Sequence, residues 1–376
     1  MKISDVTTHV LEAPLSVPFR WSFNRADSRS TVLVEITTDT GLVGWGECFG
    51  PARPIAAIIA AFKPLLVDAD PLAIEAIWQD LYNKFRDQGQ KGMVISAISG
   101  VDIALWDIKG KHFNAPIHQL MGGPLRTEVE AYATGMYRRD EGDPLDYLVE
   151  EALGYVAEGF KGVKLKLGFD VEGDVAIAQA VRKAVGPDIK LMMDANHGYD
   201  VIDAIRLGRR VEDLDIRWFE EPVVPEDLAG YREIKAALTI PLAGGECDFT
   251  RYGFRDILTS RSIDIIQPDT CAAGGLSECK KIADMANAFH VRYVPHVWGT
   301  GIGLAASLQL LGVLPHTPPS WTPTEPLLEF DRSEHPFRQE ILMEPLEHEQ
   351  GQVAIPTGPG LGIEINREMV AHFRAE

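Results

Sequence analysis

The feature that most constrains the fold is a regular alternation of short apolar runs and helix-like stretches from about residue 128 onward. A strand followed by a helix, repeated at a constant interval, is typical of a parallel sheet and most simply of a (β/α) barrel. An open, doubly wound sheet produces the same alternation, so the spacing alone leaves that alternative open. Successive runs end 28, 26, 26, 23 and 27 residues apart, at Lys166, Asp194, Glu220, Glu246, Asp269 and His296.

The first part of the chain follows a different pattern. Two β-rich runs within residues 31–47 flank Asp39-Thr40-Gly41, which predicts a hairpin. Strands followed by helices indicate an α+β unit over residues 1–125, before a barrel over residues 126–339. The tail, residues 340–376, is rich in proline and glycine and is expected to pack back on the first unit. A helix from residue 94 to about residue 113 is predicted by the helical spacing of Val94, Ile98, Val101, Leu105 and Ile108.

The charge balance excludes several classes of partner. The 376 residues contain 36 Lys and Arg against 55 Asp and Glu, a formal net charge of −19. This charge repels a nucleic-acid backbone and an anionic membrane surface, so neither is expected as a partner. No stretch approaches the ~18 apolar residues of a membrane span, the N-terminus lacks a secretory apolar segment, and the four cysteines form no CxxC pair. We expect a soluble, cytoplasmic protein with reduced thiols.

Three consecutive predicted strands end in a carboxylate, at Asp194, Glu220 and Glu246. The C-terminal ends of barrel strands surround one cavity, so these side chains are expected to converge there. Without a cation the three carboxylates would repel one another and raise each other's pKa values, and a divalent cation removes this repulsion. Three hard oxygen donors without His or Cys suit Mg²⁺ far better than Zn²⁺. Glu221 follows Glu220 and points to the opposite face, so alternation does not choose between the two.

Ionisable side chains on neighbouring strands complete a candidate site. Lys164 and Lys166 lie two residues apart on one strand, so both point into the cavity. A lysine beside another cation and a metal holds its proton less tightly and can act as a general base. Across the ring, Asp269 can orient His296 and raise the basicity of its other ring nitrogen. The alternatives are a solvated lysine pair and a histidine satisfied within the core.

This combination favours removal of the proton from a carbon next to a carboxylate. The enediolate left behind carries two negative oxygens, which Mg²⁺ and Lys164 would stabilise. An NAD-dependent oxidoreductase is the enzymatic alternative, prompted by Gly299-Thr-Gly-Ile-Gly303. That spacing is not G-x-G-x-x-G, and residues 304–324 contain no acid to hold a ribose. A non-catalytic barrel that only binds a ligand is the alternative from another class.

The sequence resembles the mandelate racemase group of the enolase superfamily over nearly its whole length. The resemblance is specific because it rests on many separate motifs rather than on one. The motifs are Ser99-Gly-Val-Asp-Ile-Ala-Leu-Trp-Asp-Ile-Lys-Gly-Lys111, Gly122-Gly123, Lys164-x-Lys166, Asp194-Ala-Asn196, Glu220-Glu-Pro222, Gly244-Gly-Glu246, Gln267-Pro-Asp269 and Pro295-His296.

The resemblance implies an α/β fold, a modified (β/α)8-type TIM barrel with an N-terminal α+β capping domain. The cap would comprise residues 1–125, completed by 340–376. The resemblance also implies a homo-oligomer and Mg²⁺ bound by Asp194, Glu220 and Glu246. Lys166 and the His296–Asp269 pair would be the acid/base groups on opposite faces of the substrate, leaving open which is the base. Lys164 would contact the substrate carboxylate, and Glu329 would hydrogen-bond it, with Glu325 as the alternative.

Closer comparison favours the members that act on acid sugars. Arg86-Asp-Gln-Gly-Gln-Lys-Gly92, Gly50-Pro-Ala-Arg-Pro54, Val294–Gly301 and Glu329-Phe-Asp-Arg resemble the bacterial galactarolactone cycloisomerases, which open an aldaric acid lactone by β-elimination to a deoxy-keto acid. Acid-sugar dehydratases and epimerases or racemases of the same family are the alternatives. Cys247-Asp248-Phe249 departs from the pattern and leaves the substrate open. Residues 19–25 and 48–53 are candidate specificity loops, and the candidate substrate-binding residues are Arg20, Arg25, Arg53, Asn196 and Trp298. The three arginines could meet a distal carboxylate, and ordinary surface arginines are the alternative.

Overall fold

The computed structural model describes residues 1–322 and 326–375. Within them, eight parallel strands follow one another around a barrel in the order β12-β4-β6-β7-β8-β9-β10-β11. The strands are β4 (Glu128–Thr134), β6 (Gly162–Lys166), β7 (Lys190–Asp194), β8 (Ile216–Glu220), β9 (Leu242–Gly244), β10 (Ile265–Ile266), β11 (Arg292–Tyr293) and β12 (Leu328–Asp331). The two ends of this sheet meet where the backbone N–H of Val297 donates to Oε2 of Glu329 at 2.9 Å. The predicted barrel is therefore confirmed, and the open sheet is excluded.

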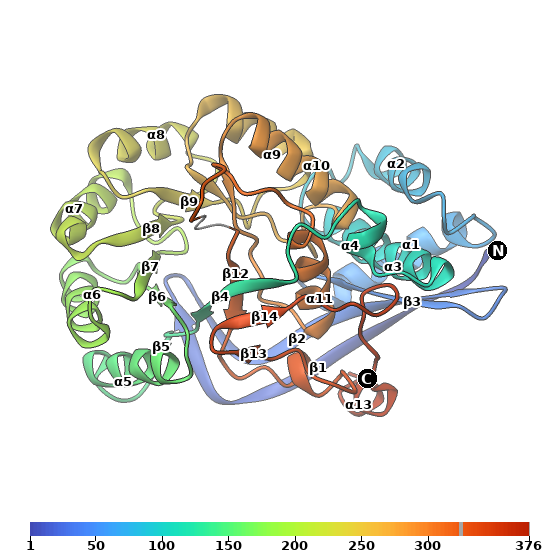
Figure 1. Ribbon diagram of the computed structural model, residues 1–376, viewed down its shortest axis with the longest axis horizontal. Coiled ribbons are helices and arrows are strands. Elements are labelled where there is room, and N and C mark those ends of the chain that lie inside the picture. The colour runs from blue at the N-terminus through green and yellow to red at the C-terminus, as the bar shows by residue number, and fades with distance from the viewer. Residues whose placement is uncertain (323–325, 376) are drawn as a thin grey trace.

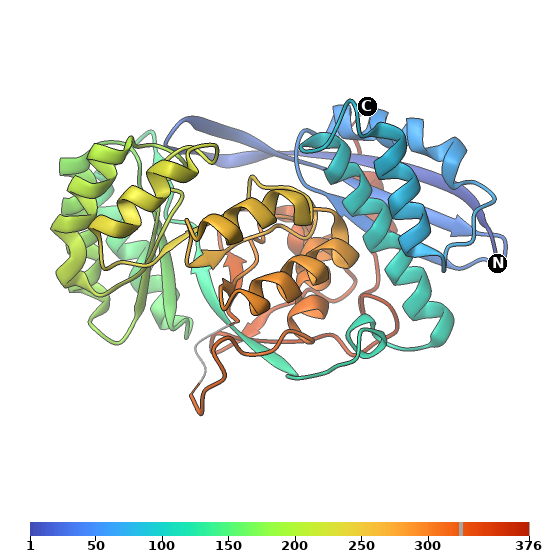
Figure 2. The ribbon, with the colours of Figure 1, turned by 90° about the horizontal axis from the view of Figure 1, so that it is seen from above.

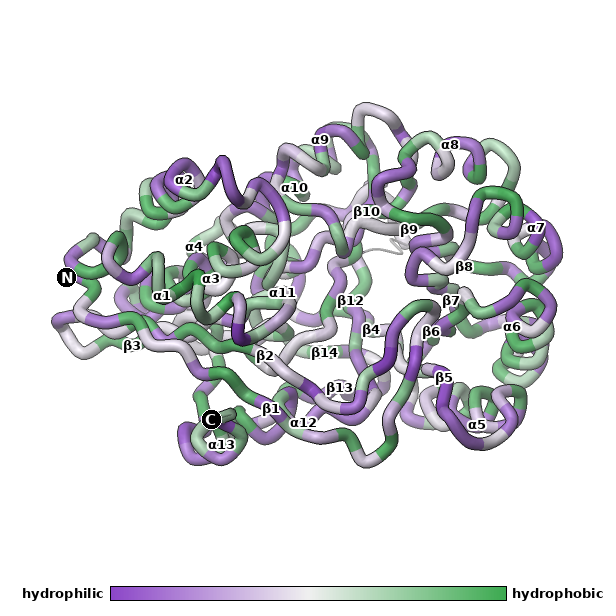
Figure 3. The backbone as a smooth tube through the Cα atoms, turned by 180° about the vertical axis from the view of Figure 1, so that it is seen from behind, coloured by the Kyte–Doolittle hydropathy of each residue, from purple (hydrophilic) through white to green (hydrophobic). Residues whose placement is uncertain are grey.

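Helices connect these strands and cover the outside of the barrel (Figure 1). In α7, Ala204, Leu207 and Val211 are buried at helical spacing, while the opposite face is polar. Figure 3 shows the same mixture of hydrophobic and hydrophilic residues along α5, α6, α8, α9 and α10, whereas α11 is buried along its whole length. The helices are α5 (Pro144–Ala157), α6 (Val171–Val185), α7 (Val201–Val211), α8 (Leu228–Ala237), α9 (Thr250–Ser260), α10 (Gly275–Ala288) and α11 (Gly301–Leu311), with a 3-10 turn at Glu212–Leu214.

A separate apolar cluster fills the inside of the barrel. It contains Tyr132, Met192, Trp218, Ala243, Ile265, Val294 and Leu327, one residue from or beside each of seven strands. The barrel interior is thus a packed core rather than a pore, and the site lies above it, at the C-terminal ends of the strands. No helix among residues 1–322 and 326–375 has both the length and the hydrophobicity needed to span a membrane.

The N-terminal part forms a second sheet, in the order β3-β2-β1-β5. The predicted hairpin is present as β2 (Asn24–Thr38) and β3 (Val43–Cys48), which pair antiparallel. The predicted helix is α3 (Met93–Phe113). It is flanked by α1 (Ala52–Leu66), α2 (Ile74–Phe85) and the short α4 (Ile117–Leu120).

The long strand β1 (Ile3–Trp21) and the full length of β2 were not predicted from the sequence. These two strands form a hairpin that reaches across the molecule toward the barrel (Figure 2). Near its tip, Phe19 and Arg20 pair with β5 (Arg138–Arg139), which directly follows barrel strand β4. The hairpin thereby brings residues 19–25 to the mouth of the barrel.

The C-terminal tail contacts both parts of the molecule. It contains α12 (Pro336–Gln339), β13 (His348–Glu349), β14 (Gln352–Ala354) and α13 (Arg367–His372). Strand β14 pairs with β4 of the barrel, whereas the backbone N–H of Ala375 donates to the carbonyl of Val10 in β1 at 2.9 Å. The division into a cap of residues 1–125 with the tail and a barrel of residues 126–339 stays a prediction.

The conspicuous motif Ser99–Lys111 joins α3 to the barrel rather than entering the site. Oγ of Ser99 accepts a hydrogen bond from the backbone N–H of Gly274 at 2.9 Å, just before α10. Oδ2 of Asp102 accepts from the backbone N–H of Ser277 at 2.9 Å, in the first turn of that helix. Both side chains are buried. They satisfy helix amides that have no partner within α10.

We expect Asp102→Asn to remove a pH-dependent loss of stability. Burial raises the pKa of Asp102 from 3.8 to about 7, so the folded state holds this proton more tightly than the unfolded chain. The contribution to stability is therefore complete below about pH 4 and is lost as the pH rises toward 7. Urea unfolding should show that the advantage of the variant over wild type grows by about 3 kcal/mol between pH 5 and pH 8.

The matched control is Asp188→Asn, which alters an exposed aspartate on a loop. It should change the stability equally at the two pH values. An Asp102→Asn variant with the same pH dependence as wild type would contradict the assignment of this proton to Asp102.

Candidate active site

The predicted carboxylates meet at the C-terminal end of the barrel. Strand register places Lys166 beside Asp194, and Asp194 beside Glu220. Glu246 lies two residues beyond the end of β9, because the hydrogen-bonded strand is shorter than the predicted run 241–246. Oxygen atoms of Asp194, Glu220 and Glu246 all lie within 4.8 Å of one another. The structure therefore brings together the three side chains that sequence analysis grouped.

The donor set of this triad suits a hard divalent cation. All three groups are carboxylates, and Oε2 of Glu246 accepts no hydrogen bond from any residue that the structure describes. Glu220 is held by three donors: Lys164 Nζ at 2.5 Å, Gln267 Nε2 at 2.6 Å and Trp218 Nε1 at 2.9 Å. Burial raises the pKa of Glu220 to about 7, and the neighbouring acids add to the effect. A cation bound to the triad would stabilise the charged carboxylates and so oppose this rise in pKa.

Lys164 is fully buried among acids. Its Nζ lies 2.7 Å from Oε1 of Glu329 and 3.7 Å from Oδ2 of Asp194, in addition to its contact with Glu220. Burial alone would lower the pKa of Lys164, but Glu220 and Glu329 outweigh it and raise that pKa well above its ordinary value. Glu329 thus lies beside Lys164, and its hydrogen bond to a substrate carboxylate stays a prediction. Glu325, the alternative, lies outside the described residues.

Lys166 reaches the cavity beside Asp194. Its Nζ donates to Oδ2 of Asp194 at 2.5 Å and to Oδ1 of Asn196 at 3.1 Å. Burial would lower the pKa of Lys166, but Asp194 outweighs it, so the carboxylates by themselves raise this pKa. Burial likewise would raise the pKa of Asp194, and the two lysines instead lower it to about 2. The lysine and the carboxylate therefore form an ion pair.

His296 and Asp269 form a hydrogen-bonded pair. Asp269 lies just after β10 and His296 lies just after β11. The backbones of the two residues are paired by an isolated parallel β-bridge. Nδ1 of His296 lies 2.7 Å from Oδ2 of Asp269, while Nε2 lies 3.5 Å from Oε2 of Glu246. Burial would lower the pKa of His296, but Glu246 and Asp269 outweigh it and raise the pKa to about 10. Asp269 is held in turn by the backbone N–H of Cys271 at 2.6 Å.

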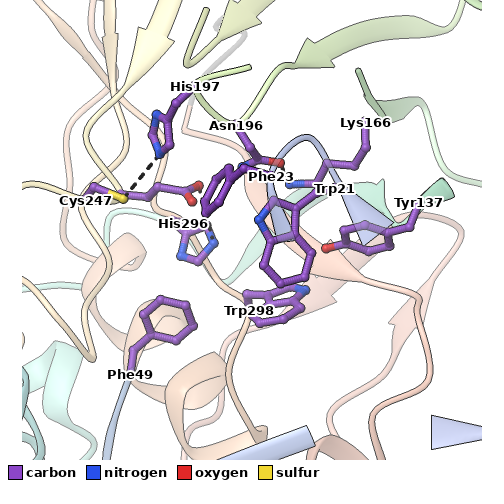
Figure 4. Close-up of a pocket in the computed structure, with 11 residues that line it drawn as sticks. Trp21, Phe23, Phe49, Tyr137, Lys166, Asn196, His197, Cys247, His296 and Trp298 are labelled. Carbon is purple, nitrogen blue, oxygen red and sulfur yellow. Dashed lines mark hydrogen bonds and ion pairs between the residues drawn. The ribbon is translucent and has the colours of Figure 1, made fainter. Parts of the chain in front are cut away.

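A cavity of about 140 Å³ lies above these groups (Figure 4). Lys166 and His296 reach it from different sides. Much of the remaining wall is aromatic, with rings of Trp298, Trp21 and Phe49 packed edge to face. The cavity is lined by Trp21, Phe23, Phe49, Tyr137, Lys166, Asn196, His197, Glu246, Cys247, His296 and Trp298.

The five candidate substrate-binding residues divide into two groups. Asn196 and Trp298 line the cavity, as sequence analysis expected. The three arginines instead form ion pairs elsewhere: Arg20 with Asp140 at 2.6 Å, Arg25 with Asp27 and Asp140, and Arg53 with Glu12 at 3.4 Å. Each is about half exposed, and none belongs to the wall of this cavity, all of which lies in the described residues.

The two candidate specificity loops reach the cavity, while the ion pairs of their exposed arginines fit the alternative that these are ordinary surface residues. Residues 19–25 and 48–53 reach the cavity through Trp21, Phe23 and Phe49 rather than through their arginines. Tyr137 was also missed, because the first barrel strand was not included among the repeating runs. The available signal was the run of apolar residues in β4 (Glu128–Thr134), because Tyr137 lies three residues beyond the end of that strand.

The glycine-rich segment 299–303 has a structural explanation. It forms the start of α11, where a dinucleotide phosphate would have to bind. Oε2 of Glu47, on β3, accepts the backbone N–H of Gly303 at 2.8 Å, and Oε1 accepts that of Thr300 at 2.8 Å. A buried carboxylate of the chain itself thus occupies this helix end, which excludes a pyrophosphate there.

The fold is a capped barrel with acidic and basic side chains at the ends of its strands. This combination is typical of enzymes that move a proton next to a carboxylate, and comparison with known families identifies the family. Residues 4–122 match the mandelate racemase / muconate lactonizing enzyme N-terminal domain. Residues 147–369 match the enolase C-terminal domain-like family. The chain therefore belongs to the mandelate racemase / muconate lactonizing enzyme family of the enolase superfamily.

The relatives are isomerases and lyases. The chain is 52% identical over 374 residues to a D-galactarolactone cycloisomerase of Agrobacterium fabrum, covering 100% of this chain and 99% of that one. It is 36% identical to an arabinonate dehydratase of Saccharolobus solfataricus, covering 92% and 91%. A 3,6-anhydro-D-galactonate cycloisomerase from Zobellia galactanivorans shares the fold with a TM-score of 0.91, 40% identity and complete coverage of both chains. A racemase from Streptomyces coelicolor A3(2), solved with bound magnesium, has a TM-score of 0.89 and 29% identity, covering 99% and 100%. The chain is an enzyme of the isomerase or lyase kind.

Proposed function

We propose that the protein removes the proton next to the carboxylate of an acid-sugar lactone and then eliminates the β-oxygen, as a galactarolactone cycloisomerase does. The observation that carries this proposal is the cavity between Lys166 and His296, beside three clustered carboxylates. The 52% identity to a D-galactarolactone cycloisomerase supports the choice of substrate.

Asp194, Glu220 and Glu246 would hold Mg²⁺. When bound, Mg²⁺ supplies positive charge that stabilises the negative charge developing on the substrate carboxylate. Its charge also opposes the effect of these carboxylates on the pKa of Lys166. The buried ammonium group of Lys164, held by Glu220 and Glu329, would donate to the same substrate carboxylate.

Lys166 and His296 would transfer the protons. One of them takes the proton from the carbon next to the carboxylate, and the electron pair of that C–H bond forms a double bond to the β-carbon. The bond from the β-carbon to the lactone oxygen breaks, and that oxygen leaves as a carboxylate. The other group returns a proton as the resulting enol becomes a deoxy-keto acid. Asp269 keeps Nδ1 of His296 protonated, so that Nε2 is the exchanging atom.

The aromatic wall of the cavity favours a cyclic substrate. The C–H faces of a lactone ring can pack on Trp21, Trp298 and Phe49, whereas an open polyol would leave many hydroxyls without partners there. Asn196 and Tyr137 provide polar atoms for the remaining hydroxyl groups.

The test is incubation with galactarolactone and Mg²⁺ in D₂O, followed by NMR spectroscopy. The expected result is a linear deoxy-keto acid that carries one deuterium at the former β-elimination site, formed only when Mg²⁺ is present. The control omits Mg²⁺ and includes a chelator. An unchanged lactone under both conditions would contradict the proposal.

An acid-sugar dehydratase is the second candidate, favoured by the similarity to arabinonate dehydratase. The same bases would then act on an open-chain aldonate and expel water rather than a lactone oxygen. Turnover of aldonates but not of lactones in the same assay would identify this activity. Location in the cytoplasm and assembly into a homo-oligomer stay predictions.

A further inference from the structure

A second cluster of side chains of the types that bind metals lies at the mouth of the barrel, one to three residues beyond the carboxylate triad on the same three chain segments. His197 lies three residues after Asp194, whereas Glu221 and Cys247 directly follow Glu220 and Glu246. Ligand atoms of these three residues lie within 4.8 Å of one another. Neither Cys247 nor His197 has a part in the proposed reaction, although both line the cavity (Figure 4).

The distances within this cluster match those around a tetrahedral ion. Zinc bonds of about 2.0–2.3 Å in tetrahedral arrangement place two ligand atoms about 3.3–3.7 Å apart. Sγ of Cys247 lies 3.7 Å from Nε2 of His197, and this nitrogen lies 3.2 Å from Oε2 of Glu221. The backbone N–H of His197 donates to the carbonyl of Glu221 at 2.8 Å, which holds two of the three residues in place.

Glu221 provides independent support for a ligand. Its side chain is 1% exposed, yet Oε2 accepts no hydrogen bond from any residue within 1–322 or 326–375. The contact with His197 brings the two atoms close without the alignment of a hydrogen bond. A buried carboxylate oxygen in this state is costly unless a cation or proton occupies the position that it faces.

We propose that His197, Glu221 and Cys247 form a second cation site, selective for a thiophilic divalent metal such as Zn²⁺. A thiolate and an imidazole are soft or borderline ligands that favour zinc over magnesium, whereas the all-oxygen triad has the reverse preference. Three protein ligands leave a fourth position open, as in catalytic rather than structural zinc sites. Cys247 is exposed and lines the cavity, whereas Cys48, Cys271 and Cys279 are buried, so a metal ion can reach this thiol from the cavity.

The test uses Co²⁺ as a spectroscopic probe. Protein stripped of metal is first saturated with Mg²⁺, to fill the triad, and is then titrated with Co²⁺. The expected result is one Co²⁺ bound per chain, with a thiolate-to-cobalt charge-transfer band in the near ultraviolet that Zn²⁺ abolishes. Cys247→Ser should lose the band, and His197→Gln should weaken Co²⁺ binding by about tenfold or more.

Cys48→Ala is the matched control, because it removes a buried thiol on β3 and should keep the band. Glu220→Gln should also keep it, since Glu220 belongs to the other cluster. Wild-type protein without the band, or a band that persists in Cys247→Ser, would overturn the proposal. So would a band lost only in Glu220→Gln. The readout is metal binding, so it is independent of whether galactarolactone is the substrate.

Discussion

Glu220→Gln should lower Mg²⁺-dependent turnover by about 10³-fold or more, because weaker Mg²⁺ binding removes the several kcal/mol of charge stabilisation that the metal supplies in the transition state. The substitution keeps the shape of the side chain but removes one anionic ligand from the triad. It also turns an acceptor of three hydrogen bonds into a group that carries its own donor, next to Lys164 and Gln267. Steady-state kinetics across a Mg²⁺ titration measures the loss, and calorimetry measures Mg²⁺ binding directly.

Glu128→Gln is the matched control for this substitution. Glu128 is an exposed glutamate at the N-terminal end of β4, at the opposite end of the barrel from the site. It should leave both Mg²⁺ binding and turnover unchanged. Normal Mg²⁺-dependent turnover in a folded Glu220→Gln variant would refute the assignment of the metal to the triad.

Lys166→Ala and His296→Asn should each lower turnover by about 10²–10⁴-fold, the usual contribution of a positioned acid or base. The two variants should nevertheless differ in D₂O. Ring opening needs only the base, whereas the second group returns the proton to the former β-carbon. The variant that keeps the base should therefore still open the lactone, but the released enol should take up deuterium from solvent without stereochemical preference. NMR spectroscopy of the product identifies that variant, and with it the base.

His290→Asn is the control for the histidine substitution. His290 is exposed at the end of α10 with a φ of 57°, a left-handed conformation that asparagine adopts readily. This control should retain full activity. Full turnover in both Lys166→Ala and His296→Asn would exclude the acid/base scheme. Circular dichroism checks that both variants are folded.

The similarity of the strand ends explains why so much of the site could be predicted from the sequence. In a parallel barrel every strand ends at the same rim, so a residue that closes a strand has a known place without any knowledge of distant contacts. Asp194, Glu220 and Lys166 follow this rule directly. Glu246, Asp269 and His296 lie just beyond shorter strands than predicted, yet they still reach the rim.

The upper wall of the cavity could not be predicted in the same way. Trp21 and Phe23 reach the barrel because β1 and β2 form a long hairpin that pairs with β5. This arrangement depends on pairing between segments more than 100 residues apart, which local patterns do not reveal. The arginines of the same loops were chosen for their charge, but nearby acids neutralise them at the surface.

The sequence by itself therefore determined the repeating barrel, its ring of acids and bases, and the family, because each depends on local alternation and on residues at strand ends. Only the tertiary structure decided which side chains line the upper wall of the cavity and that Glu47 occupies the start of α11. It also decided that His197, Glu221 and Cys247 meet as a second cluster. These features arise where separate chain segments pack together, and the free energy of such packing depends on shape and burial rather than on the periodicity of any one segment.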